Sequence, residues 1–389
     1  MTGTPGFDAF ERERDALTAW LVEDALPLWW RVDADRAAGG FFELIGLDGK
    51  PIDGVRRVRV PARQVYCFAT GRDLGWNGPF DAVEHGLNFL VTKCYSPKGF
   101  FWSNVTPDGT PVGREFDLYD NAFGLFALAV AFAARTDRVL LATLADTIRD
   151  NLIENFAHPL GGFEEAVPCS LPLRANPHMH LLEAALAWIE IDPVDVEWNA
   201  LADELAELCL AKYLHPANGC VREFFDGDWN PIAGEMGHIA EPGHQFEWGW
   251  LLARWGRLRG RDDALAAAKK LVTLGEQYGV DAKRGVAFNE MWDDLSPKNK
   301  AARLWPQTER IKGWLTMASL GETAGEIDEA FANVASAAAG LRLYLETPIR
   351  GLWRDKMGTA GRFVEEPAPA SSLYHIVCAI SEMHAVARS

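Results

Sequence analysis

The chain has 389 residues, and its 55 acidic against 38 basic side chains give a net charge of −17. Such a charge opposes binding to nucleic acid or to an anionic membrane surface, so neither is expected as a partner. The longest wholly apolar run, residues 122–134, is too short to span a bilayer. The charged N-terminal segment lacks the apolar core of a signal peptide. The six cysteines form no paired framework, which predicts reduced thiols in a cytoplasmic protein.

A glycine followed closely by apolar and aromatic residues recurs six times along the chain. Successive clusters lie about 60 residues apart, which indicates an internal repeat. Several clusters run on into turn sequences such as LDGK, PDGT and FDGD, so each cluster predicts a short β-hairpin. The glycines are Gly40, Gly99, Gly162, Gly219, Gly285 and Gly351.

Two helical stretches fill the interval between successive hairpins. The stretch before each hairpin carries apolar residues at positions i, i+3, i+4 and i+7 with charges between them, which predicts a half-exposed helix. The stretch after each hairpin is apolar almost all round, which predicts a buried helix. The half-exposed helices are expected at residues 13–30, 80–95, 138–156, 197–214, 262–279 and 327–346. The buried helices are expected at residues 62–75, 117–134, 176–190, 243–258, 306–320 and 371–386.

This alternation predicts an all-α fold, an (α/α)6 barrel, in which buried helices form an inner ring and half-exposed helices an outer ring. No linker-like or low-complexity segment interrupts the repeat, so residues 1–389 are expected to form a single domain. Because every inner helix follows a hairpin, all inner helices begin at the same end of the barrel. Side chains in their first turns should therefore converge on one pocket beside the hairpins.

Polar side chains interrupt the buried helices at a common position, the first turn or two after a hairpin. Helix N-termini present unpaired N–H groups and a positive potential, which favours negative charge nearby. His244 and Glu247 are three residues apart and so share one helix face. A single histidine of this kind is more often a capping or core residue than a catalyst, but three in the same phase indicate a site. The full set is Arg63, Asn176, His180, His244, Glu247, Glu309 and His375.

The sequence HMH at residues 178–180 resembles a metal-binding pair, with Glu183 one turn further along the chain. Residues i and i+2 of a helix point to different faces, so His178 and His180 should not share an ion. His180 and Glu183 could share one, but no closed set of ligands follows. No metal and no cofactor are therefore expected.

Five motifs give the chain a resemblance to the N-acylglucosamine 2-epimerase family, which includes mannose isomerases and cellobiose 2-epimerases. The motifs are PARQVY around Arg63, NPHMHLLEA from Asn176, GHQFEW from Gly243, WPQTE from Trp305 and LYHI from Leu373. The likeness covers nearly the whole chain. It implies an (α/α)6 barrel that acts on the open-chain form of a sugar without a metal.

The resemblance also implies roles for individual residues. His244 and His375 would form an acid/base pair. Sugar-binding or supporting roles are implied for Arg63, Asn176, His180, Glu247, Trp305 and Gln307, and Glu309 of the WPQTE motif is expected beside them. Pro306 and Thr308 depart from the family's pattern, which leaves the shape of the pocket there open.

These residue types suit proton transfer next to a sugar carbonyl. Removing a proton from carbon 2 of an aldose requires a base with a pKa near neutrality, which histidine supplies. The enediolate that forms carries negative charge on oxygen, and a fixed Arg63 stabilises it more than it stabilises the neutral sugar. Glu247 is expected to orient His244 and to raise its pKa. His244 is expected to take the proton, and His375 to open the ring or to deliver a proton.

The sequence thus predicts a sugar isomerase that interconverts an aldose and a ketose of the mannose and fructose kind. A 2-epimerase acting on N-acylglucosamine, on glucose and mannose, or on cellobiose is the first alternative, because the residue set suits both reactions. A glycoside hydrolase or lyase needs two opposed carboxylates, for which Glu247 and Glu309 are available, but it would leave three histidines without a task. A protein that only binds a partner has no reason to place histidine and arginine at the inner helix starts.

The nature of the sugar and the state of assembly are less constrained. No glycine-rich phosphate loop and no cluster of lysine or arginine is evident near the pocket motifs, which favours a free sugar. Whether two copies of the chain pair as a homodimer stays open.

Overall fold

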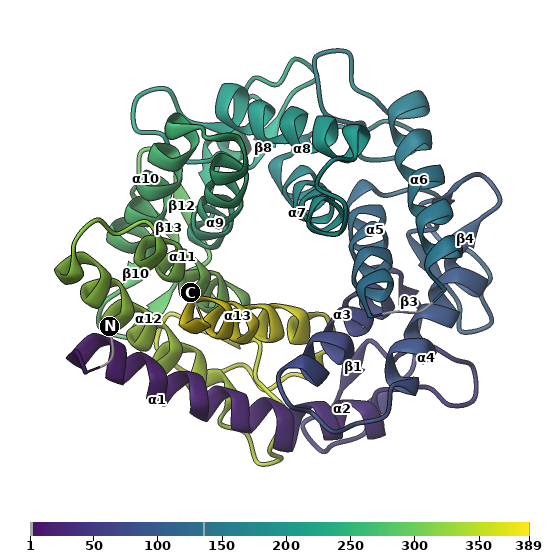
Figure 1. Ribbon diagram of the computed structural model, residues 1–389, viewed down its shortest axis with the longest axis horizontal. Helices are drawn as coiled ribbons and strands as arrows, with labels where there is room; N and C mark the ends of the chain where they lie inside the picture. The colour runs from purple at the N-terminus through teal and green to yellow at the C-terminus, as the bar shows by residue number, and fades with distance from the viewer. Residues whose placement is uncertain (1–2, 135–136, 389) are drawn as a thin grey trace.

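Two concentric rings of helices make up the computed structural model, which describes residues 3–134 and 137–388 (Figure 1). The inner ring consists of α3 (Arg59–Asp73), α5 (Leu118–Ala133), α7 (Ala175–Ile191), α9 (Pro242–Arg259), α11 (Trp305–Ser319) and α13 (Ser371–Arg388). Each inner helix packs against the next, and α13 packs against α3, which closes the ring. The predicted (α/α)6 barrel is confirmed.

The outer ring consists of the half-exposed helices, one set for each unit of the repeat. They are α1 (Pro5–Ala19) with α2 (Leu26–Val32), α4 (Asp81–Phe89), α6 (Arg138–Asn155), α8 (Val196–Leu208), α10 (Asp262–Gly279) and α12 (Ala324–Leu345). Short π-helical turns at Trp20–Ala25, Leu90–Cys94 and Cys209–Tyr213 follow three of these helices directly. Helix α1 packs against α12, so the first and last outer helices meet (Figure 1).

A left-handed backbone conformation explains the six repeated glycines. All six have a positive φ angle, from 70° at Gly40 to 92° at Gly351, where any residue with a Cβ atom is strained. The chain reverses at these positions, as at Gly99 between β4 (Tyr95–Ser96) and β5 (Phe100–Phe101). The periodicity of the sequence is therefore a backbone requirement that each unit meets once.

The strands are shorter than the predicted hairpins, and they also join neighbouring units. Inside a unit, β1 (Leu44–Ile45) pairs with β2 (Pro51–Ile52), β10 (Val280–Asp281) with β11 (Val286–Ala287), and β12 (Glu290–Trp292) with β13 (Pro297–Asn299). Between units, β3 (Arg56–Arg57) pairs with β6 (Asn104–Val105), β7 (Leu173–Arg174) with β8 (Phe224–Phe225), β9 (Ile239–Ala240) with β12, and β14 (Ala302–Arg303) with β15 (Lys356–Met357).

The last strand, β16 (Ala368–Pro369), pairs with β1 of the first unit, so the strand pairs form a belt around one end of the barrel. In each of these pairs the strand that precedes an inner helix lies against the hairpin of the next unit. The belt satisfies backbone groups that a two-residue hairpin would leave free, and it fixes where each inner helix begins.

The space between the rings is filled by apolar side chains, most of them in one large core beside two smaller clusters. Trp248, Trp250 and Trp255 of α9 are all buried in the large core, so they serve packing rather than as open platforms for a sugar ring. Among the described residues, no helix combines the length and the apolar character that crossing a membrane would require.

Candidate active site

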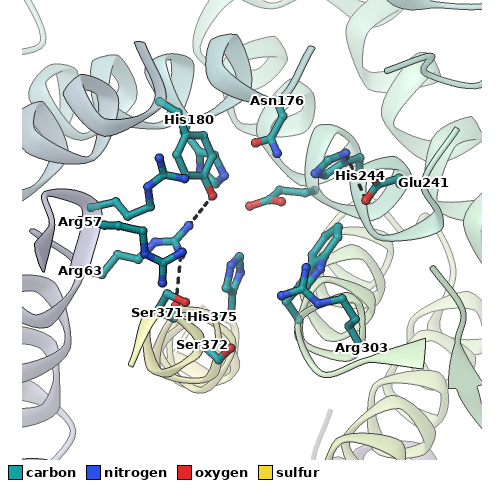
Figure 2. Close-up of a pocket in the computed structure, with 14 residues that line it drawn as sticks. Arg57, Arg63, Asn176, His180, Glu241, His244, Arg303, Ser371, Ser372 and His375 are labelled. Atoms are coloured by element: carbon teal, nitrogen blue, oxygen red, sulfur yellow. Dashed lines mark hydrogen bonds and ion pairs between the residues drawn. The ribbon is translucent and has the colours of Figure 1, made fainter. Parts of the chain in front are cut away.

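A cavity of about 250 Å³ opens at the belt end of the barrel, where the inner helices begin. Seven of the nine residues that the sequence predicts for the site line this cavity, and they come from five inner helices. They are Arg63, Asn176, His180, His244, Glu247, Trp305 and His375. In Figure 2 the side chains of Arg63, His180, His244 and His375 gather around a common space. The structure thus brings them together as their common phase predicts, while their chemical roles stay predictions.

Seven further residues line the cavity without having been singled out from the sequence. They are Arg57, Arg59, Tyr119, Glu241, Arg303, Ser371 and Ser372. Most of them lie within a few residues of the first residue of an inner helix, in the belt strand or in the first helical turn. Extending the search two residues back from each helix start would have found the arginines of the strands, because the belt faces the same space as the helix ends.

Several buried polar atoms around the cavity have no hydrogen-bond partner among the described residues. They are Nε of Arg63, Oδ1 of Asn176 and both carboxylate oxygens of Glu247. Leaving a buried polar group without a partner costs about 1–3 kcal/mol. The three residues offer a charged donor, an amide acceptor and a carboxylate acceptor, which suits a ligand whose hydroxyl groups both donate and accept.

Two carboxylates lie beside Nδ1 of His244, and neither belongs to Glu247. Nδ1 donates to Oε2 of Glu223 at 2.8 Å, and Glu241 lies 3.9 Å away. The prediction that Glu247 orients His244 is wrong, because the face that the two residues share points both side chains into the cavity rather than at each other. Burial lowers the pKa of His244, but Glu223, Glu241 and Glu247 together raise it to about 10. His244 is therefore an imidazolium at neutral pH.

Glu223 belongs to a set of acidic residues that close the glycine clusters of their units. Glu43 accepts hydrogen bonds from the backbone N–H and from Nε of Arg57, and Glu165 accepts the same two from Arg174. Glu223 accepts from the backbone N–H of Glu241 at 3.3 Å as well as from His244. In each unit the acid thus holds the residue that leads into an inner helix, and this repeated position is the signal that could have revealed Glu223.

His375 has a carboxylate partner as well, but cations surround that pair. Its Nδ1 donates to Oε1 of Glu309 at 2.9 Å, and Oε2 of Glu309 forms an ion pair with Nζ of Lys312 at 2.6 Å. Lys312 is fully buried, with its ammonium 3.9 Å from the ring centroid of Trp250. Burial, Arg63 and Lys312 lower the pKa of His375 well below its usual value. His375 is therefore a neutral imidazole, and its Nε2 has no partner among the described residues.

Two predicted sugar-binding residues lie outside the cavity lining. Glu309 lies behind His375, where it holds the imidazole as described above. Gln307 is 1% exposed, accepts from the backbone N–H of Ala287 and donates to its carbonyl, both at 2.8 Å. The prediction that these two bind sugar is therefore not supported by their positions. Gln307 follows Trp305 by two residues, and positions i and i+2 of a helix face different ways.

The pair of hydrogen bonds by which Gln307 holds both backbone groups of one residue recurs in other units. His178 also bonds the backbone of its unit. Gln245 bonds both backbone groups of Val221, and Asn121 bonds both backbone groups of Phe101. His178 accepts from the backbone N–H of Phe163 through Nε2, while its Nδ1 contacts the carbonyl of Arg174. Both ring nitrogens are thus occupied, and burial lowers the pKa of His178 to about 4. This histidine is therefore structural, and its contacts are with the backbone of its own unit rather than with His180.

Arg63 is held rigidly at the floor of the cavity. Its two Nη groups donate to the carbonyl of Ser371 at 3.2 Å and to the hydroxyl of Tyr119 at 2.6 Å (Figure 2). Its guanidinium also lies 4.0 Å from the ring centroid of Phe123. Each end of the guanidinium fork is anchored by one hydrogen bond, so the cation is presented to the cavity in one orientation. Three of its five N–H groups, that of Nε included, have no partner among the described residues.

Trp305 and His180 complete the walls. The ring of Trp305 lies 4.9 Å from that of His244 and 5.9 Å from that of His375, so the indole adjoins both histidines. Nδ1 of His180 bonds Oε2 of Glu183 at 3.0 Å. His180 lines the cavity (Figure 2), and its Nε2, which has no hydrogen-bond partner among the described residues, is available for a further hydroxyl contact.

Three groups of ligand-type side chains lie close enough together to be tested as metal sites. They are His180 with Glu183 and Glu247, His244 with Glu223 and Glu241, and His375 with Glu247 and Glu309. In each group a hydrogen bond already joins the histidine to one of the carboxylates. In the third group the ammonium of Lys312 supplies the positive charge, 2.6 Å from Glu309 and 3.6 Å from Glu247. In each group at least the histidine and one carboxylate are thus already engaged, while both oxygens of Glu247 keep no hydrogen-bond partner in the part of the chain that the structure describes.

The two-ring barrel holds one protonated and one neutral histidine over a polar cavity, an arrangement that suits proton transfer on a hydroxyl-rich ligand. The sequence profile of the N-acylglucosamine 2-epimerase family matches residues 40–379. The chain is 45% identical to a protein of Rhizobium meliloti (strain 1021) named mannose-6-phosphate isomerase, over 94% of this chain and 95% of that one.

Solved structures show the same architecture. Cellobiose 2-epimerase from Spirochaeta thermophila DSM 6192 superposes with a TM-score of 0.82 at 23% identity, covering 97% of this chain and 98% of that one. A D-mannose isomerase superposes with a TM-score of 0.83 at 18% identity, covering 96% and 97%. The chain belongs to the N-acylglucosamine 2-epimerase family. It is a carbohydrate enzyme, an aldose–ketose isomerase or a 2-epimerase.

Proposed function

We propose that the protein interconverts an aldose of the mannose kind and the corresponding ketose by moving a proton between carbon 2 and carbon 1 of the open-chain sugar. One observation carries this proposal: His244 and His375 line the same cavity in opposite states of protonation, with Arg63 fixed beside them. A neutral histidine, an imidazolium and a fixed cation are the three groups that enediol formation requires.

The charge surroundings reverse the roles that the sequence suggested for the two histidines. His375 is the base, because Glu309 accepts from Nδ1 and leaves the Nε2 lone pair to take a proton. His244 is the acid, because the nearby carboxylates keep it protonated. Arg63 lies where negative charge develops on the sugar oxygens during the transfer.

The proton transfers then balance over one turnover. His375 takes the proton from carbon 2 while His244 gives its proton to the oxygen on carbon 1, which leaves an enediol. His375 returns its proton to carbon 1, and the hydroxyl proton on carbon 2 passes to His244 as the ketose forms. Both histidines are restored, and no external proton donor is consumed.

The size of the cavity and the names of the relatives favour isomerisation of a monosaccharide. A cavity of about 250 Å³ lies below the range of about 300–1,000 Å³ typical of drug-sized ligands, so a disaccharide would extend beyond it. The Rhizobium meliloti relative is named for an isomerase of a phosphorylated sugar and the D-mannose isomerase for a free one. The names therefore agree on the reaction and leave the phosphate open. A 2-epimerase on the same residues is the second candidate, because cellobiose 2-epimerase shares the fold.

The hydrolase alternative loses one of its two carboxylates. Both oxygens of Glu309 are bound, one by His375 and one by Lys312, and the residue does not line the cavity. Glu247 then lacks the opposed partner that glycosidic cleavage needs. A purely binding role leaves the opposed protonation states of the histidines without a purpose.

We also propose that the whole ring acts as one catalytic unit in a reducing compartment such as the cytoplasm. Strands and helices of the last unit close on those of the first, so the cavity needs every unit in place. All six cysteines are free, and five of them are buried, which supports the expectation of reduced thiols.

The test is product analysis with mannose deuterated at carbon 2, and separately with its 6-phosphate, followed by NMR. An isomerase gives the fructose product, with part of the deuterium carried to carbon 1 because one base serves both carbons. An epimerase gives the glucose product with a solvent proton at carbon 2, which would replace the proposal by its alternative. No conversion of either substrate would overturn the isomerase proposal and leave only an epimerase of another sugar.

A further inference from the structure

Arginine side chains dominate the charge of the cavity, although the protein as a whole carries a charge of −17. Arg57, Arg59, Arg63 and Arg303 line the cavity, against the carboxylates of Glu241 and Glu247. The expectation that no arginine cluster lies near the pocket motifs is wrong, because three of the four lie within residues 57–63, beside the PARQVY motif, and only Arg303 comes from a distant strand, β14. A cationic cleft on an acidic protein attracts anions selectively.

The four arginines differ in what remains free on the guanidinium. Arg59 gives Nε and Nη2 to Asp120, and Arg63 gives both Nη groups to Ser371 and Tyr119. Arg57 is held through Nε by Glu43 at 2.6 Å, and Arg303 through Nε by Asp355 at 3.2 Å. The Nη groups of Arg57 and Arg303 have no hydrogen-bond partner within residues 3–134 and 137–388. Each of these two arginines is thus oriented by a carboxylate while its terminal fork stays available.

These two arginines lie at the mouth of the cavity, and the reacting groups lie further in. Arg57 is in β3 and Arg303 in β14, both strands of the belt, whereas Arg63 and His375 lie about one helical turn inside α3 and α13. Figure 2 shows Arg57 on the same wall as Arg63, and Arg303 on the wall beyond His375. A sugar chain with carbons 1 and 2 at the histidines therefore has its far end at the mouth.

We propose that Arg57 and Arg303 bind a phosphoryl group at the far end of the sugar, so that the substrate class is a phosphorylated hexose rather than a free one. This inference rests on the proposed isomerase function and adds the substrate class to it. A phosphate dianion offers three strong acceptor oxygens, and a guanidinium fork binds two of them in parallel. This proposal puts a phosphorylated sugar in place of the free sugar that the sequence favoured.

The carboxylates that line the cavity do not oppose this assignment. Glu247 lies at the floor, 3.6 Å from the ammonium of Lys312. Glu241 lies beside the imidazolium of His244, 3.9 Å away, and its charge is opposed there. Glu43 and Asp355 bind Nε of the two mouth arginines and do not line the cavity. An arriving phosphoryl group therefore meets the free forks of the arginines.

The structure supplies a matched control for these two residues. Arg174 occupies the equivalent place in its unit, at the end of strand β7, and its Nε is held by Glu165 at 2.6 Å. Unlike Arg57 and Arg303, it does not line the cavity. Arg174→Gln therefore removes the same charge from the same kind of position without touching the proposed phosphate site.

The experiment compares kcat/KM for mannose 6-phosphate and for mannose in the wild type, Arg57→Gln, Arg303→Gln and Arg174→Gln. We expect the wild type to prefer the phosphorylated sugar by at least about tenfold, and inorganic phosphate to inhibit competitively. Losing one charge-assisted contact lowers kcat/KM for the phosphorylated sugar by roughly ten- to a hundredfold, and the loss for mannose is much smaller. Arg174→Gln keeps the wild-type preference.

The outcomes separate this inference from the proposed function. Equal turnover of both sugars without competition by phosphate overturns the phosphate site and leaves the isomerase standing. An unchanged preference in both Arg57→Gln and Arg303→Gln also overturns it. A fall in only one of the two variants supports a phosphate site built on that arginine. Conversion of neither sugar by the wild type refutes the isomerase itself.

Discussion

His244 and His375 occupy corresponding places in two units of the repeat, and their surroundings differ in the sign of the charge. Each lies in the first turns of an inner helix, lines the cavity and has a carboxylate on Nδ1, at 2.8 Å and 2.9 Å. Glu241 places a second carboxylate near His244. The carboxylate beside His375 is bound by Lys312. One histidine therefore holds a proton that the other has lost.

The difference shows how a repeated fold produces two unlike catalytic groups. The repeat determines where a side chain enters the cavity, and residues outside the repeated pattern determine its protonation. Lys312 is such a residue: the fold requires no charge inside α11, yet this ammonium neutralises Glu309. An acid and a base over one substrate are needed together for proton transfer in both directions.

The largest effect is expected from removing either histidine. His375→Asn and His244→Asn should each lower kcat by about two to four orders of magnitude, the usual scale for losing a general base or acid. Asparagine keeps a hydrogen-bonding group near the position of Nδ1, so the fold should survive, which circular dichroism and thermal unfolding would check. Near-normal turnover in either variant would remove that histidine from the mechanism. Loss in one variant alone would leave a single residue acting as both acid and base.

The positions of the two histidines could be predicted from the sequence. The charges around them, which set their protonation, could not. The glycines, the two kinds of helix and the phase of the polar residues follow from local backbone and periodicity rules, and they located six lining residues. The seventh, Trp305, came from the resemblance to the family. Glu223 and Lys312 escaped notice for different reasons. Glu223 is 21 positions from His244 and reaches it from the residue just before strand β8. Lys312 looked like an ordinary polar residue of a helix, and only the packed barrel shows that it is buried against two carboxylates.

Glu223→Gln should reduce the effect of the carboxylates that keep His244 protonated. The pKa of His244 is about 10 in the wild type, so His244 stays protonated, and kcat/KM stays level, from neutral pH until it falls above pH 10. Without the Glu223 charge the pKa of His244 falls, and the alkaline decline moves to lower pH. A charge-assisted bond of about 1.5–3 kcal/mol corresponds to a shift of about one to two pH units. Glu241→Gln, at 3.9 Å, serves as the comparison and should give a smaller shift. A pH profile unchanged by Glu223→Gln would show that His244 does not set the alkaline limb.

Lys312→Met should reduce the effect of the cations that keep His375 neutral. Its effect on the rate at neutral pH should be smaller than that of Glu223→Gln. Lys312 is among the cations that lower the pKa of His375, so removing it raises that pKa. The base is then protonated at higher pH, and the acid decline of kcat/KM moves toward neutrality. Lys312→Arg keeps the charge and should retain more of the wild-type profile. Because Lys312→Met leaves Glu309 and Glu247 buried without their cation, thermal unfolding is measured in parallel, with a lower midpoint expected. A destabilised variant with an unshifted acid limb would make Lys312 purely structural.

The smallest effect, none at all, is expected from exhaustive chelation. A divalent ion in the group of His375, Glu247 and Glu309 would have to displace the ammonium of Lys312, which lies 2.6 Å from Glu309. In the group of His244, Glu223 and Glu241, an ion would need the Nδ1 atom that already donates to Glu223, on a histidine that carries a proton. Metal ligands must be deprotonated, so the imidazolium state that makes His244 an acid also opposes metal binding there. Turnover is measured before and after dialysis against EDTA, with added divalent ions as the control. Loss of activity that a divalent ion restores would contradict both the acid role of His244 and the difference in charge between the two histidines.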